Sequence, residues 1–262
     1  MRLALFTGLL TLLLAAPALA ITNGVADGNT HPNAGAFVAA DWLRPGQKDV
    51  FCSGTLISPT VFLTAAHCTS YLESLGISQV WVTFDEKFSS KAKLYPGHMY
   101  THPLYGHDEH DPHDIAVIVL DQAVKGITPA RLPPAGLFDQ LKAAGTLSSQ
   151  LFTNAGYGGQ ERVIQPGGPV IGYNDAREYS VSSFNALNDY YMRLSQNAAT
   201  GDAGTCYGDS GGPQFLGAGS SEQNMVVSTT ITGDSQCVST NVTYRLDTAS
   251  ARNFLAQFVT LP

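Results

Sequence analysis

The chain has 262 residues, with 14 Lys and Arg against 21 Asp and Glu, and its formal net charge at pH 7 is −7. The chain is acidic, and its sequence contains no cluster of Lys and Arg that could bind along a phosphate backbone. Nucleic-acid binding is therefore excluded as a main function. A chain of this length buries enough surface to fold without a dense set of disulfides.

The first 20 residues, MRLALFTGLLTLLLAAPALA, predict an export signal. One Arg precedes an uncharged apolar run, and Pro17 interrupts that run before Ala18-Leu19-Ala20, the small-x-small pattern at which signal peptidase cuts. A membrane anchor is the alternative, because the apolar run is nearly long enough to cross a bilayer. The lone Arg, the proline and the cleavage pattern favour removal, after Ala20 or, leaving a Leu19-Ala20 dipeptide, after Ala18. We therefore expect a secreted protein with no stable membrane association once the signal is cut.

The rest of the chain consists largely of short β-branched and aromatic runs separated by Gly, Pro, Asn and Ser, which is typical of an all-β sandwich or barrel. Residues 247–259 predict a helix, with one apolar face behind an Asp247 or Thr248 cap, packed against the outside of the second half. Three prolines in residues 127–145 predict a connection between a unit of about 21–126 and a unit of about 146–262. The expected strands are 37–43, 60–65, 79–84, 115–120, 177–184, 225–231 and 242–246.

Ser210 is a candidate nucleophile, since it lies in AGTCYGDSGGP between pairs of small or acidic residues. A serine hydroxyl needs a base within hydrogen-bond reach, usually an imidazole held by a carboxylate. The sequence GDSGG also fits the nucleophile elbow of α/β-hydrolases, whose histidine follows the serine. That arrangement is excluded because all seven histidines precede Ser210: His31, His67, His98, His102, His107, His110 and His113.

His67 is the candidate base, although a histidine at the end of an apolar strand is more often structural. It directly precedes Cys68, and a Cys52–Cys68 disulfide across the expected hairpin would clamp its loop with about 3 kcal/mol of stabilisation. The four cysteines permit three pairings on sequence alone. Asp114 opens an apolar strand and is the candidate carboxylate, with Asp111 as its rival.

Three segments together resemble the chymotrypsin-like serine endopeptidases: LTAAHC around His67, DIAVIVL after residue 113 and CYGDSGGP around Ser210. They occur in the order of that family with similar spacing, and ITNG at 21–24 and AGYG at 155–158 match further family segments. The resemblance implies two packed six-stranded antiparallel β-barrels with a C-terminal α-helix. It also implies a monomeric enzyme that cleaves proteins or peptides through an acyl-enzyme and needs no cofactor.

The resemblance assigns roles residue by residue. His67 would exchange a proton with Ser210, Asp114 would orient His67, and the amides of Gly208 and Ser210 would form the oxyanion hole. A Cys206–Cys237 disulfide would tie the serine loop to the pocket wall. In the family a freshly cut amino terminus pairs with the Asp before the serine; the matching partners here are Ile21 and Asp209, so signal cleavage would itself produce the active terminus.

The substrate pocket departs from trypsin. Gly204 stands where trypsin-like members carry the Asp that binds Lys or Arg, and Asp202 is two positions away. The wall is expected at Ser228-Thr229-Thr230, next to Thr205, with Tyr244 near it and Val242 at a position where a pocket glycine is common. These residues predict a preference for small or medium apolar side chains.

Two other functions compete with this one. The first is an inactive protease-fold binding protein, disfavoured because all three catalytic positions are intact. The second is a metal site in GHDEHDPHD, residues 106–114, where His107, His110 and His113 are ligand types that suit zinc. No helical spacing fixes them, so a solvated acidic loop and no metal are expected. The sequon at Asn241 lies inside an expected strand and is weak evidence for glycosylation.

Overall fold

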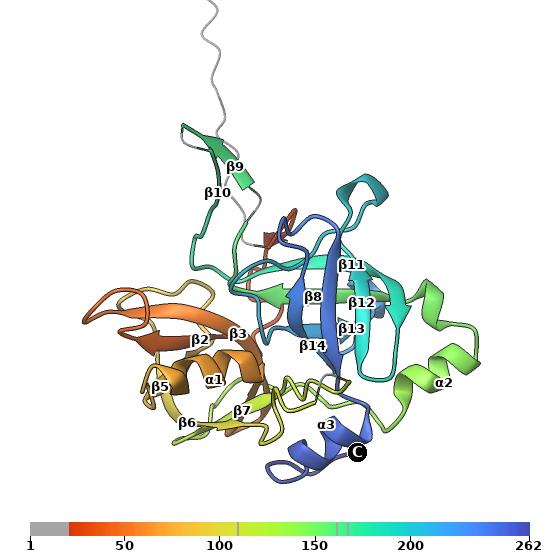
Figure 1. Ribbon diagram of the computed structural model, residues 1–262, viewed down its shortest axis with the longest axis horizontal. Coiled ribbons are helices and arrows are strands. Elements are labelled where there is room, and N and C mark those ends of the chain that lie inside the picture. The colour runs from red at the N-terminus through yellow and green to blue at the C-terminus, as the bar shows by residue number, and fades with distance from the viewer. Residues whose placement is uncertain (1–20, 109, 161, 167) are drawn as a thin grey trace, which may run out of the picture.

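The computed structural model describes residues 21–262 except 109, 161 and 167, and it consists of two β-barrels placed side by side (Figure 1). The expected signal, residues 1–20, lies outside the described residues. Within the described residues, no helix is long and apolar enough to cross a membrane.

The first barrel closes through six antiparallel strands in the order β2-β3-β4-β7-β6-β5, with β5 pairing back onto β2. Its interior is apolar, with Phe37, Leu56 and Phe62 fully buried. Gly54 lies so close to Phe62 that an added Cβ would come within 2.4 Å of its ring, and this contact explains why the strand has no side chain there. The strands are β2 (Ala34–Ala40), β3 (Lys48–Ser58), β4 (Val61–Thr64), β5 (Val80–Thr83), β6 (Tyr95–Thr101) and β7 (Ala116–Leu120).

The second barrel closes through β11-β12-β15-β14-β13-β8, with β8 pairing back onto β11. The strands are β8 (Leu151–Gly156), β11 (Glu178–Leu187), β12 (Tyr191–Ser195), β13 (Pro213–Leu216), β14 (Val226–Gly233) and β15 (Thr240–Arg245). The short β1 (Val25–Ala26) adds to β11, so this part of the expected first unit lies on the second barrel. The two six-stranded antiparallel barrels confirm the predicted fold class.

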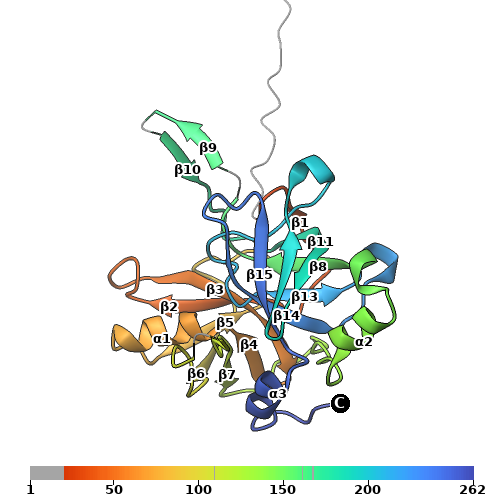
Figure 2. The ribbon, with the colours of Figure 1, turned by 45° about the vertical axis from the view of Figure 1, so that its right-hand side comes forward.

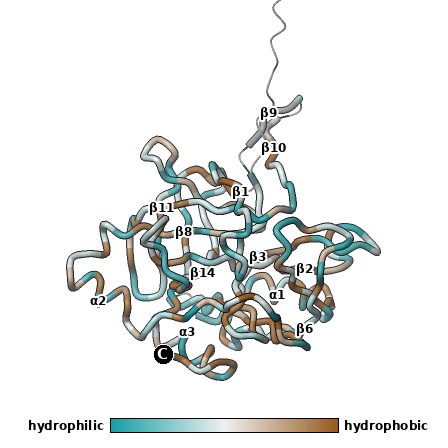
Figure 3. The backbone as a smooth tube through the Cα atoms, turned by 180° about the vertical axis from the view of Figure 1, so that it is seen from behind, coloured by the Kyte–Doolittle hydropathy of each residue, from teal (hydrophilic) through white to brown (hydrophobic). Residues whose placement is uncertain are grey.

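Many residues buried in the second barrel are polar, and much of β8, β11 and β14 is white or teal in Figure 3. Asn154 donates to Ser180 and Ser182 at 3.1 and 2.8 Å, and other buried polar groups bond to one another in the same way. The buried polar residues of these strands include Asn154, Ser180, Ser182, Gln214, Ser228, Thr230, Asn241 and Thr243.

In the part of the chain that the structure describes, three α-helices flank the barrels: α1 (Ala66–Ser74), α2 (Leu137–Ala143) and α3 (Ala249–Leu255). The predicted C-terminal helix is present as α3, capped by Thr248, whose side chain accepts from Ala251 N at 3.2 Å. Its buried residues share one core cluster with Val117 of β7 and Val226 of β14. The helix therefore packs at the junction of the two barrels, whereas the sequence placed it against the outside of the second half.

The sequence did not predict α1 or α2. His67 was expected at the end of a strand but lies in the first turn of α1, and α2 lies within the predicted connection 127–145. Short 3₁₀ turns occur at Leu147–Ser149, Ala198–Thr200 and Gly219–Ser221. A hairpin of β9 (Arg162–Gln165) and β10 (Gly168–Ile171) projects away from the barrels (Figure 2).

Candidate active site

His67 and Asp114 are held together by two hydrogen bonds. The backbone N–H of His67 donates to Asp114 Oδ1 at 2.9 Å, and its Nδ1 lies 2.9 Å from Asp114 Oδ2. Because a carboxylate only accepts, Nδ1 carries the proton and Nε2 is left as an acceptor. This is the tautomer that a proton-accepting base requires.

Asp111, the rival carboxylate, lies elsewhere. Its Oδ1 accepts from the hydroxyl of Tyr244 at 2.8 Å and from His113 N at 3.0 Å. Asp114 rather than Asp111 therefore contacts His67.

Ser210 and His67 line one pocket of about 310 Å³. Ser210 lies within a tight turn in which Gly208 and Gly211 adopt φ of +95° and +79°, in the left-handed region that favours glycine. Ser53 of β3 fixes this turn across the barrel junction: its N–H donates to Ser210 O at 2.9 Å and its hydroxyl to Gly208 O at 3.0 Å. The serine loop of the second barrel is thereby tied to the first barrel, which carries the other two side chains.

The orientation of the peptide between Tyr207 and Gly208 bears on the expected oxyanion hole. Tyr207 O accepts from Gly159 N at 2.7 Å. Since C=O and N–H point in opposite directions in a trans peptide, the N–H of Gly208 points away from Gly159.

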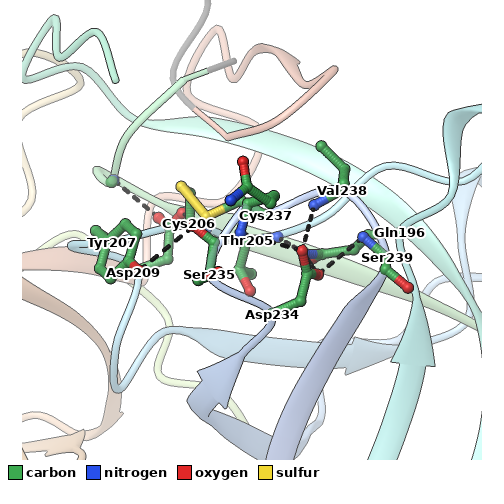
Figure 4. Close-up of a disulfide and its surroundings, with 12 residues drawn as sticks. Gln196, Thr205, Cys206, Tyr207, Asp209, Asp234, Ser235, Cys237, Val238 and Ser239 are labelled. Carbon is green, nitrogen blue, oxygen red and sulfur yellow. Dashed lines mark hydrogen bonds between the residues drawn. A yellow bond between two sulfur atoms is a disulfide. The ribbon is translucent and has the colours of Figure 1, made fainter. Parts of the chain in front are cut away.

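Both disulfides occur in the pairing that the resemblance implies. Cys52–Cys68 joins β3 to the residue after His67, and Cys206–Cys237 joins the serine loop to the chain beyond β14, as Figure 4 shows. The sulfurs of the first pair lie near His67, but they are bonded to each other and offer no thiolate to a metal.

The pocket wall lies further along the chain than predicted. Thr230 is bonded to the serine loop, since its O accepts from Gly211 N at 2.7 Å and its N donates to Gly212 O at 3.0 Å. The wall that follows is Ile231, Thr232 and Gly233, with Asp234, Ser235 and Cys237 beyond it.

Of the five expected pocket residues, the structure places Thr205 and Thr230 in the lining. Ser228 is fully buried and donates to Gln214 at 3.1 Å, and Val242 lines a neighbouring cavity of about 610 Å³ together with Asp114. Neither residue lies in the lining of the cavity that contains Ser210.

Gly204 and Tyr244 are also absent from the residues that line the described pocket. The register pairs Thr230 with Thr243, so Tyr244 faces the other way, toward the first barrel. A Cβ on Gly204 would come within 2.0 Å of Gln196 Oε1, so the glycine makes room for that side chain.

Two carboxylates lie near the serine loop in sequence or space, Asp234 and Asp202, and both accept hydrogen bonds from the protein. Asp234 is a lining residue, but its carboxylate accepts from the backbone N–H groups of Ser239 and Thr240, both at 2.8 Å, and these bonds lower its pKa against the effect of burial (Figure 4). Asp202 accepts from the backbone N–H and the hydroxyl of Ser183 at 2.9 and 3.0 Å. Both carboxylates therefore already accept hydrogen bonds from the protein.

Asp209 is completely buried beside the serine. Its oxygens accept from Gly158 N at 2.8 Å and from Cys206 N at 2.9 Å. Burial raises the pKa of Asp209 to about 7, because desolvation outweighs these bonds. A Cβ on Gly156 would come within 2.1 Å of Asp209 Oδ1. This close approach explains why the first glycine of AGYG has no side chain.

The segment that begins at Ile21 lies beside the serine loop. Ile21 is fully buried, and Thr22 O accepts from Gly204 N at 3.2 Å. The structure thus brings the residue expected to become the amino terminus into the body of the second barrel.

Sequence reasoning missed a buried cation, Arg177. Its side chain is fully buried and donates to Asp27 at 2.8 Å, to the carbonyls of Ala34 and Phe84 at 3.0 Å each, and to the hydroxyl of Tyr157 at 3.1 Å. An Arg in an otherwise ordinary polar run gives no signal of this burial. The cluster fixes the N-terminal segment against both barrels.

The histidines of residues 106–114 do not gather around one point. His113 contacts Ser250 at 2.9 Å, while His110 is exposed and packs its ring edge-on against Tyr190. Among the described residues, this loop forms no group that could hold a metal. The side chain of Asn241 is fully buried in the second barrel, where it could not carry a glycan.

Comparisons with known proteins agree on one family. The family model described as Trypsin matches residues 27–252. Glucanase inhibitor protein 1 of Phytophthora sojae is 29% identical over 78% of this chain and 76% of its own length. A trypsin of Phaedon cochleariae is 33% identical over 63% of this chain and 64% of its own length, and one of Saccharopolyspora erythraea is 28% identical over 71% and 77%.

A solved structure of HL collagenase resembles the fold with a TM-score of 0.67 at 17% identity. The match covers 90% of this chain and 97% of that one.

Proposed function

The chain belongs to the trypsin family, and on this basis we propose that it is a secreted serine endopeptidase that acts through His67, Asp114 and Ser210. The observation that carries the proposal is the double hydrogen bond between Asp114 and His67, whose ring lines the same pocket as Ser210. It leaves Nε2 of His67 free to take a proton.

In the proposed reaction Ser210 Oγ attacks the carbonyl carbon of a peptide bond while His67 Nε2 accepts the hydroxyl proton. His67 then gives this proton to the leaving amine as the C–N bond breaks, which leaves an acyl group on Ser210. Water attacks the acyl group in the same way and restores the serine. Asp114 stays ionised throughout and stabilises the charged imidazole.

The amides of Gly208 and Ser210 are proposed to hold the oxyanion. The bond from Gly159 N to Tyr207 O supports this role for Gly208, because it turns the amide away from that side of the loop. The two bonds from Ser53 keep the turn rigid, so the donors are in position before the charge develops. Loss of one such donor costs on the order of 100- to 1,000-fold in rate.

The proposed preference is for a small or medium apolar side chain before the scissile bond. The modest pocket volume and the branched residues Thr205, Thr230 and Ile231 support it, and both nearby carboxylates are engaged by protein donors. Peptide anilides ending in Ala, Val, Leu, Phe and Arg test the preference. A rate that is highest for Arg would contradict it.

An inactive binding protein is the second candidate, favoured by one finding: a relative of similar length is described as an inhibitor of a glucanase. Incubation with an organofluorophosphate separates the two functions, because an activated serine reacts stoichiometrically. We expect one label per chain, on Ser210, and none in the His67→Ala variant, which keeps the serine. If the correctly processed protein stays unlabelled while an ordinary trypsin reacts, the enzyme proposal is lost.

Export is part of the proposal. Two disulfides in the described chain are typical of an oxidising compartment, and the first 20 residues have the composition of a cleaved signal. Protein sequencing of the secreted chain from its amino terminus tests the prediction that it begins at Ile21. A monomer that acts on protein or peptide substrates without nucleic acid is proposed on the same family basis.

A further inference from the structure

A buried polar cluster joins the loop that carries Asp114 to the second barrel and to α3. Its members are Asp111 and His113 of the loop, Tyr244 of β15 and Ser250 of α3; the first three are 2%, 8% and 0% exposed. We propose that this cluster positions Asp114, so that Tyr244 and Ser250 act as positioning residues for the reaction although neither reaches the substrate. The inference rests on the proposed function.

The cluster is connected by hydrogen bonds from three elements. The Tyr244 hydroxyl donates to Asp111 Oδ1 at 2.8 Å, and the Ser250 hydroxyl lies 2.9 Å from His113 Nδ1 and 3.3 Å from the Tyr244 hydroxyl. Asp111 also accepts from His113 N at 3.0 Å. The loop, the strand and the helix are thus held by one network in which a buried carboxylate depends on donors from the opposite barrel.

The backbone at His113 carries this restraint to Asp114. His113 has a φ of +50°, a left-handed conformation that is unfavourable for a residue with a side chain. Ile115 N donates to His113 O at 2.8 Å, so the chain turns tightly at Asp114 itself. The direction in which the carboxylate leaves the chain is therefore set by the conformation of His113.

The side chain of His113 is held so that this conformation persists. Its ring stacks on His102, with centroids 4.5 Å apart and planes 7° apart, and His102 packs on Phe254 of α3 at 4.9 Å. Burial and the neighbouring His113 lower the pKa of His102 to about 4, so this ring is neutral at working pH and the stack carries no repulsion from it. α3 thus contacts both rings, one through Ser250 and one through Phe254.

The restraint matters because the three candidate catalytic residues come from both barrels: His67 and Asp114 from the first and Ser210 from the second. Tyr244 and α3 follow Ser210 in the chain, and both contact the loop that carries Asp114. The cluster therefore fixes the carboxylate relative to the barrel that supplies the nucleophile.

Tyr244→Phe tests the proposal, because it removes the hydroxyl and keeps the ring. We expect kcat to fall about tenfold, since small misplacement of a catalytic group is costly, while KM stays within about twofold because Tyr244 does not line the pocket. The low-field proton NMR resonance of His67 Nδ1–H should shift upfield as its bond to Asp114 lengthens. Ser250→Ala should change kcat and the resonance in the same direction, and it serves as the test if Tyr244→Phe does not fold.

Thr153→Val is the matched control. It removes a buried hydroxyl that donates to Gly217 O at 3.1 Å, outside the cluster and away from α3, so kcat and the resonance should stay at their wild-type values. The proposal is overturned if Tyr244→Phe leaves both unchanged, or if Thr153→Val lowers kcat equally. The resonance is measured without turnover: a shift in Tyr244→Phe in a protein whose Ser210 cannot be labelled would support the positioning and refute the proposed function.

Discussion

Asp209 gives a prediction whose size follows from the structure. Its carboxyl is completely buried, it makes no ion pair within the described residues, and its pKa is raised from 3.8 to about 7. Between these values the folded protein binds a proton that the unfolded chain has lost, so the contribution of Asp209 to stability is largest below about pH 4 and falls as pH rises to 7. A difference of about three pKa units corresponds to about 4 kcal/mol.

The test compares a protein with one residue before Ile21 with one that begins at Ile21, whose amino group becomes an ammonium. Between pH 4 and 8 we expect the extended protein to lose about 4 kcal/mol more unfolding free energy than the protein that begins at Ile21, because the ammonium of the latter stabilises ionised Asp209. Urea unfolding at several pH values measures both.

Asp209→Asn in the extended protein is the control and should remove this pH dependence. The extended protein should also cleave peptides at least about 100-fold more slowly, because an oxyanion donor would be misplaced. Equal pH profiles for the two proteins, or full activity of the extended one, would refute the pairing of Ile21 with Asp209.

Three further predictions concern single side chains. Asp114→Asn should lower kcat about 10,000-fold in steady-state assays with little change in stability; a loss below tenfold would contradict its assigned role. Arg177→Met should lower the unfolding free energy by about 3–5 kcal/mol in urea titrations, because it removes the buried cation that pairs with Asp27 and the donor to two buried carbonyls; a loss under about 1 kcal/mol would count against the cluster. Burial lowers the pKa of His31, but carboxylate bonds raise it to about 9. Its stabilisation of about 3 kcal/mol should be present below pH 6.5 and lost as pH rises through 9, and Glu222→Gln should flatten that profile.

The sequence by itself determined the chemical identity of the site. An intact GDSGG, a histidine next to a cysteine and a carboxylate before an apolar strand are local features, and their order limits which serine-hydrolase arrangement they fit. The resemblance added the barrels and the cysteine pairing. These features can be recognised in the sequence because a serine-hydrolase mechanism requires the same functional groups in any structural surroundings.

Only the tertiary structure decided how those groups are arranged. Asp111 and Asp114 lie three residues apart, and the sequence does not tell which of them contacts His67. The structure decides this, because Asp111 bonds to Tyr244 and Asp114 bonds to His67, both from distant segments. The sequence predicted the pocket wall to begin at Ser228, whereas the structure places Ile231 in it. The register is set by hydrogen bonds between Thr230 and the serine loop, which lies 18 or more residues earlier in the chain. Barrel closure creates such long-range contacts, and a sequence pattern that records side-chain alternation within one strand carries no information about its partner.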